Sequence, residues 1–188
     1  MKLENLIRWM LRQPAKSLLQ VESYFDFEFC EADGTVFRKE RAPLNFHRDG
    51  NGIVTVGVND MLNAYFGATT QSTAWYVGLV DNSSFSAFSS ADTMGSHSGW
   101  IENTAYNEST RPQWSAGTAA SGAITNSGTF QFTINSSVTI HGAFVTNNST
   151  KSGTSGTLWA TGALASNQSL TSGQLLKLAY TVTLTPTN

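Results

Sequence analysis

The sequence predicts a mainly β protein: an antiparallel β-sandwich or jelly-roll-like domain, preceded by a short N-terminal amphipathic helix and by a β-hairpin with a second short helix. One observation behind this is a series of short apolar or alternating stretches after residue 70, separated by turns rich in Gly, Asn and Ser. Another is that residues 109–188 hold 28 Ser and Thr, three basic residues and no acid. Such a surface suits β-structure that packs against copies of itself or a partner, although an ordinary Ser/Thr-rich β-domain would share it.

Residues 1–20 predict an N-terminal helical arm. Apolar side chains recur in KLENLIRWMLR at the spacing of one helix face, and Pro14 ends the pattern. A secretory signal is disfavoured because Arg8 and Arg12 interrupt the apolar run. A helix this short is marginal alone and needs a surface, and its own core, a partner subunit and a lipid interface all remain open. The residues expected to bind this surface are Leu3, Leu6, Ile7, Met10 and Leu11.

The next segment, residues 21–67, predicts a β-hairpin followed by a short helix. Asp33-Gly34 is a strong turn signal between two stretches of strand character, and Pro43 is expected to end the second stretch. Helical spacing over 57–66, with Gly67 at the place of a C-terminal cap, predicts the helix. In the first strand, the side chains expected to share one face are Phe25, Phe27 and Phe29.

Residues 68–188 predict the sandwich domain. The continuous apolar run AWYVGLV at 74–80 indicates a buried central strand. Residues 81–99 form a Ser-rich loop in which a short helical turn is expected near 91–94. The remaining predicted strands cover residues 100–105, 113–116, 123–124, 129–134, 138–146, 157–164 and 175–184.

Composition excludes several classes of protein. The net charge of −2 gives no broad basic field, so we expect no nucleic-acid partner. No apolar run approaches 18 residues, so no membrane span is expected. A single cysteine, Cys30, excludes an internal disulfide framework and is expected to be an inert structural thiol.

Residues capable of catalysis form no recognisable set. The three histidines lack the spacing of a zinc site, and no phosphate-binding loop occurs. Asp92 and Glu102 flank a loop that contains Trp100, an arrangement that could suit sugar hydrolysis. The plainer interpretation is a solvated loop edge beside a core tryptophan. We therefore expect no catalytic residue, no metal and no cofactor.

Seven motifs are spread over nearly the whole chain: NLIRWMLRQP, EADGTVFRKERAPLN, AWYVGLVD, ADTMGSHSGWIE, YNESTRPQW, GTFQFTI and GAFVTNNSTKSGTSGTLWA. Through these motifs the chain resembles a family of virion structural proteins of tailed bacteriophages. These motifs serve packing and turns and carry no chemistry, so the resemblance implies a non-enzymatic protein present in many copies in the particle. It leaves open the place in the virion.

We therefore expect a capsid decoration or cement protein that bridges and stabilises major capsid subunits. Its expected location is the phage head, after synthesis in the host bacterial cytoplasm, and its expected partners are the major capsid protein and copies of itself, with trimers as one arrangement. Residues 21–67, with the arm, are the expected capsid-contacting segment. The alternative is a head-fibre or tail-associated protein that contacts a host glycan through exposed-loop residues Trp100 and Trp159. A cell-wall-degrading enzyme is a weaker third interpretation.

Overall fold

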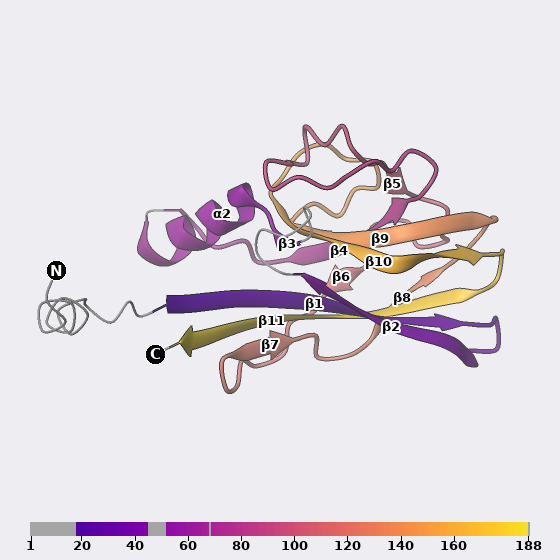
Figure 1. The fold of residues 1–188 in the computed structure, drawn as a ribbon, viewed down its shortest axis with the longest axis horizontal. Coiled ribbons are helices and arrows are strands. Elements are labelled where there is room, and N and C mark those ends of the chain that lie inside the picture. The colour runs from indigo at the N-terminus through magenta and orange to yellow at the C-terminus, as the bar shows by residue number, and fades with distance from the viewer. Residues whose placement is uncertain (1–17, 45–51, 68, 188) are drawn as a thin grey trace, which may run out of the picture.

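The described residues form a mainly β structure of two antiparallel sheets and one short helix, which confirms the mainly β class predicted from the sequence (Figure 1). The computed structural model describes residues 18–44, 52–67 and 69–187. One sheet contains β2 (Val36–Leu44), β1 (Leu18–Cys30), β11 (Leu175–Thr187), β7 (Ala123–Thr125) and β8 (Phe130–Thr133). The other contains β3 (Gly52–Ile53), β10 (Leu158–Leu170), β9 (Val138–Thr146), β4 (Trp75–Asp81), β5 (Glu102–Asn103) and β6 (Gln113–Trp114). The helix is α2 (Thr55–Phe66).

The first and last described strands pair along their whole length. β1 and β11 run antiparallel from the Leu18–Thr187 pair to the Cys30–Leu175 pair. The phenylalanines predicted to share one face of β1 are all buried, because period-2 alternation turns them toward the second sheet. The β1–β2 hairpin is thus an integral part of the sandwich: strands from the predicted segments 21–67 and 68–188 bury one common core.

The hairpin turn follows the prediction, whereas the strand after it is longer than predicted. Gly34 has a φ of +85°, and its N–H donates to the carbonyl of Glu31. This left-handed conformation is the reason for a glycine in the turn. β2 continues through Pro43, which pairs with Tyr24. A proline is tolerated there because β2 is the edge strand of the described sheet and its outer N–H positions need no partner.

The second sheet confirms the buried central strand and corrects three other predictions. Residues 77–80 of β4 are buried between β9 on one side and β5 and β6 on the other. The strand predicted over 100–105 shrinks to Glu102–Asn103, and residues 91–94 form hydrogen-bonded turns instead of a helical turn. β10 extends to Leu170, past an irregularity between Ala163 and Gln168. Polar side chains in loops and bulges make local hydrogen bonds, and the periodicity of apolar residues in the sequence does not reveal these bonds.

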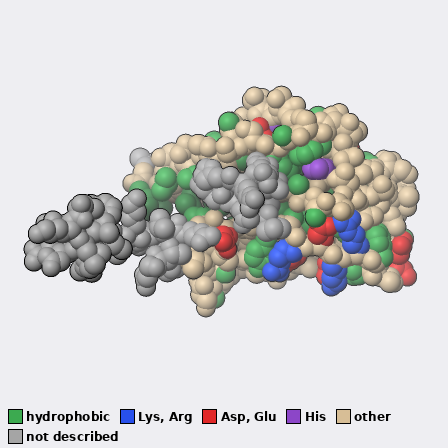
Figure 2. All heavy atoms as spheres, in the orientation of Figure 1, with side chains coloured by type: hydrophobic (Ala, Val, Ile, Leu, Met, Phe, Trp, Pro, Cys, Tyr) green, Lys and Arg blue, Asp and Glu red, His purple; other side chains and the backbone are tan. Residues whose placement is uncertain are grey.

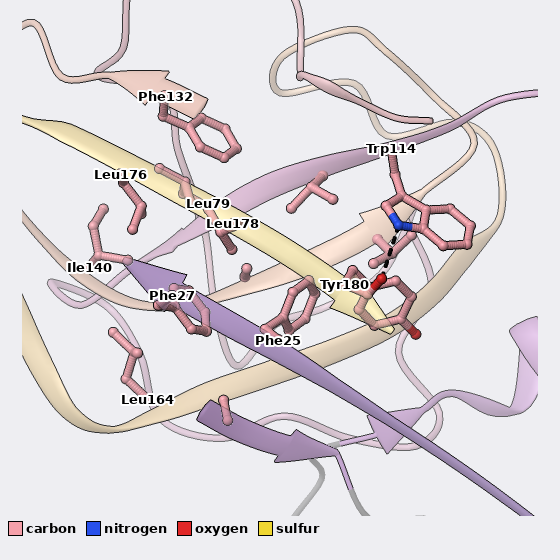
Figure 3. Packing of buried hydrophobic residues seen from close by; sticks show 14 of the residues in the cluster. Phe25, Phe27, Leu79, Trp114, Phe132, Ile140, Leu164, Leu176, Leu178 and Tyr180 are labelled. Atoms are coloured by element: carbon pink, nitrogen blue, oxygen red, sulfur yellow. Dashed lines mark hydrogen bonds between the residues drawn. The ribbon is translucent and has the colours of Figure 1, made fainter. Parts of the chain in front are cut away.

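The core lies between the two sheets and is rich in aromatic side chains (Figure 3). Phe25 and Tyr180 contact each other with ring centroids 4.7 Å apart. The indole N–H of Trp114 donates to the Tyr180 carbonyl at 3.0 Å, which ties β6 to the opposite sheet. A second cluster lies under the 81–99 loop and includes Phe88 and Phe144. The loop is therefore anchored by apolar packing.

His141 on β9 is a titratable side chain packed against aromatic rings, and we expect it to make stability sensitive to pH. Its ring stacks on Phe85 with centroids 3.5 Å apart, and its Nδ1 is buried with no hydrogen-bond partner in the described part of the chain. Burial lowers the pKa of His141 below its ordinary value, because the charged imidazolium is poorly solvated there, despite an opposing hydrogen bond with Asn167. On acidification the unfolded chain binds a proton near pH 6.5, whereas the folded chain binds it only at lower pH.

We therefore expect the free energy of unfolding to fall as the pH is lowered through and below about 6.5. His141→Phe keeps a ring on Phe85 and removes the titrating group, so its unfolding midpoint should depend less on pH. Urea titrations of both proteins between about pH 7.5 and 5 test this. Equal slopes of midpoint against pH would show that His141 does not contribute.

Candidate partner-binding surfaces

An apolar cleft with a volume of about 300 Å³ opens at the end of the sandwich where α2 lies. We call it the aromatic cleft. The two sheets and the helix all contribute to its lining, so it exposes part of the sandwich interior. The side chains that define it are Trp75, Trp114, Trp159, Val182, Met61 and Tyr65.

Backbone pairing and hydrogen bonds fix the tryptophans of the cleft. Trp75 and Trp114 are paired residues of β4 and β6. The indole N–H of Trp159 donates to the Tyr180 hydroxyl at 2.7 Å, and that of Trp114 donates to the Tyr180 carbonyl. Burial raises the pKa of Tyr180, so its hydroxyl stays protonated. Because these two indole N–H groups are satisfied internally, the cleft presents mainly apolar ring surface.

Helix α2 forms one wall of the cleft and leaves a large apolar surface uncovered. Its prediction over 57–66 is confirmed, with two more residues at the start. Gly57 lets the helix approach β10, because a Cβ there would lie 2.6 Å from the carbonyl oxygen of Trp159. At the other end, Tyr65 and Phe66 are 81% and 79% exposed. Two adjacent aromatic residues at that exposure indicate a contact surface.

A second surface, the charged face, lies on the outside of β1 and β2, and Figure 2 shows blue and red side chains gathered there. Arg41 and Asp26 are bound by two hydrogen bonds of 2.7 and 2.8 Å, and Lys39 pairs with Glu28. Opposite charges on adjacent strands stabilise the pairing modestly. Among the described residues, most of the remaining surface visible in Figure 2 is formed by other polar side chains and by backbone.

The two carboxylates considered for sugar chemistry are both occupied by structural bonds. Asp92 accepts from the Trp100 indole N–H at 2.9 Å. Glu102 accepts two hydrogen bonds from Arg111, at 2.9 and 2.8 Å, and one from the backbone N–H of Ser152. The Asp92 bond closes the connection between β4 and β5 on itself, and the Ser152 bond ties the loop between β9 and β10 to β5. The described residues also contain no cluster of three His, Cys, Asp or Glu side chains that could hold a metal.

The expectation that Trp100 is exposed in a loop is wrong. Its side chain is 1% exposed, packed against Phe88 and Phe144 and stacked on His97. The physical reason is that Asp92 satisfies the indole N–H, so the whole ring can be buried at low cost. Trp100 is therefore closed to a glycan and belongs to the core.

The other predicted site residues have different outcomes. Trp159 lies in β10 and not in an exposed loop; it is partly buried and lines the aromatic cleft. The arm residues Leu3, Leu6, Ile7, Met10 and Leu11 lie outside the described residues. Sequence reasoning missed the cleft itself, although one signal was present: tryptophans close to the ends of three predicted strands.

Comparison of the chain with models of known protein families finds no match, and comparison with curated proteins finds none either.

Proposed function

We propose that the protein is a non-enzymatic structural protein of a tailed-phage virion, a decoration or cement protein that bridges and stabilises major capsid subunits. The observation that supports this most is the division of its surface. Charge gathers on the β1–β2 face, exposed aromatic side chains gather at α2, and the charged side chains of the described residues outside the β1–β2 hairpin are all buried or partly buried. Separate faces of different character suit simultaneous contact with several neighbours.

Contact with the major capsid protein is proposed for the arm and residues 21–67, and contact between copies, including trimers, for the charge-poor domain of residues 68–188. Apolar docking of the arm supplies most of the attachment, because exposed ion pairs contribute only about 0–1 kcal/mol each. The charged face then sets the position and orientation of the protein on the capsid. Among the described helices, none is long and apolar enough to cross a membrane. The proposed location is the phage head, with synthesis in the host bacterial cytoplasm.

One observation favours a second candidate, a head-fibre or tail-associated protein that contacts a host glycan. Trp159 and Trp75 place two tilted rings 5.9 Å apart in an accessible cleft, and sugar rings stack on such surfaces. Labelled imaging of intact virions separates the two candidates. Copies over the whole head support the decoration protein, whereas a few copies at the tail or on fibres support the alternative.

Release from particles gives a quantitative prediction. Because attachment is assigned mainly to apolar docking, raising NaCl from about 0.1 to 1 M should release only a minor share of the copies, while mild urea should release most of them. Sedimentation of washed particles over both series, followed by counting of retained copies, measures this. Complete release by moderate salt alone would show that the charged face, not the arm, carries attachment.

A further inference from the structure

The aromatic cleft continues into an apolar strip on the inner face of the first sheet. Val182 lines the cleft, and Leu184 follows it on the same face of β11. Leu184 pairs with Val21 of β1, and both side chains are only partly buried. The strip therefore runs from the cleft toward the end of the sheet at which β1 begins. Figure 1 shows α2 lying at this same end, beside the ends of β1 and β11.

We call the cleft, the strip and the exposed aromatic residues of α2, which lie at one end of the sandwich, the apolar groove. Tyr65 and Met61 lie on its helix side and Trp75 and Trp159 at its inner end. A groove that exposes sandwich interior leaves apolar area in water, which costs about 25 cal/mol for each Å². An amphipathic segment of matching length would remove that cost.

We propose that residues 2–12 of the same chain occupy this groove in the free protein, with the stripe of Leu3, Leu6, Ile7, Met10 and Leu11 turned toward it. The inference concerns the free chain and does not rest on the proposed function.

Chain length supports this occupant. Val182 pairs with Ser23, five residues from the start of β1 at Leu18, so the groove begins roughly 17 Å from that start. Five residues, 13–17, separate the predicted helix from Leu18, and when extended they span roughly 17 Å. A helix of residues 2–12 would be roughly 16 Å long. The segment can therefore turn back at Pro14 and lie along the strip.

Charge also favours this segment. The polar side of the predicted helix carries three basic residues, Lys2, Arg8 and Arg12, against one acid, Glu4. Asp60 is the one charged side chain of α2, lies in the cleft lining, and has no ion-pair partner in the described part of the chain. Docking within one chain also avoids the loss of translational and rotational freedom that a second molecule would incur.

Hydrogen exchange on the full-length free protein tests the proposal. Peptides covering residues 3–11 should exchange at least about tenfold more slowly than an unstructured chain, at concentrations where sedimentation shows a monomer. Ala64→Asp with Tyr65→Asp places two charges in the groove wall and should abolish that protection. Asn59→Asp with Asn63→Asp adds the same charge to the same helix at exposed positions outside the lining, and should leave the protection intact.

Three outcomes would overturn the inference: no protection of residues 3–11 in the wild type, protection that survives the groove variant, or protection confined to concentrations at which copies associate. Protection only at concentrations where copies associate would show that the arm of a second copy occupies the groove. Exchange in β1 and β11 reports whether each variant is folded, so loss of the sandwich cannot be mistaken for loss of docking. Because no particle is present, the result is independent of where the protein sits in a virion.

Discussion

Replacing Arg111 with alanine should lower the free energy of unfolding by about 3–5 kcal/mol, a large share of the roughly 5–15 kcal/mol that holds a typical domain folded. The side chain is fully buried, and it donates to Glu102, to the Asn148 carbonyl at 2.9 Å and to the Gly153 carbonyl at 3.2 Å. The variant removes the guanidinium from two carbonyls and from a buried carboxylate, which keeps only the Ser152 N–H as a donor. Urea unfolding followed by tryptophan fluorescence should show a much lower midpoint.

Arg41→Ala is the matched control, because it breaks an arginine–carboxylate pair whose side chains are 59% and 37% exposed. Its cost should stay at about 0–1 kcal/mol. Replacing both buried partners, Arg111→Met with Glu102→Leu, should cost less than Arg111→Ala alone, because no charge is left buried. Equal effects of Arg111→Ala and Arg41→Ala would contradict the role of Arg111 as an anchor of the loop between β9 and β10.

Strands with a clear pattern of apolar residues could be predicted from the sequence, because that pattern depends on residues that are neighbours in the chain. The alternation in β1 and β11 and the apolar run of β4 reflect which face meets the opposite sheet, so these strands appear where expected. β9 has the same bounds as its prediction, Val138–Thr146. The jelly-roll detail and the virion role stay predictions.

The pairing of strands and the burial of loop side chains could not be predicted, because they depend on contacts between residues that are separated in the chain. Pairing of β1 with β11 brings together strands from the two ends of the described chain. Trp100 is buried because Asp92 and Phe144 meet it from separate segments. Likewise, the aromatic cleft exists only where Trp75, Trp114 and Trp159 come together at one end of the sandwich. The sequence shows where each tryptophan lies in the chain, but it does not show that the three come together in the fold.

Leu6→Asp with Ile7→Asp should abolish incorporation of the protein into particles. Each of the five apolar arm residues contributes about 1.5–3 kcal/mol when buried, roughly 7–15 kcal/mol in all before the costs of ordering, association and release from the apolar groove. Two aspartates in the middle of the stripe remove two of these side chains and would have to be desolvated on docking. Purified particles from cells that supply only the variant, analysed for bound copies, measure the effect.

Asn5→Asp with Gln13→Asp is the matched control, since it adds the same charge outside the apolar stripe and should incorporate normally. The isolated Leu6/Ile7 variant should keep its β-sandwich, because the strands of residues 18–187 bury a core of their own. Normal incorporation of that variant would exclude the arm as the capsid contact. Loss of the sandwich would instead place the arm within the domain's own core, so that circular dichroism of the free variant decides how an incorporation defect is interpreted.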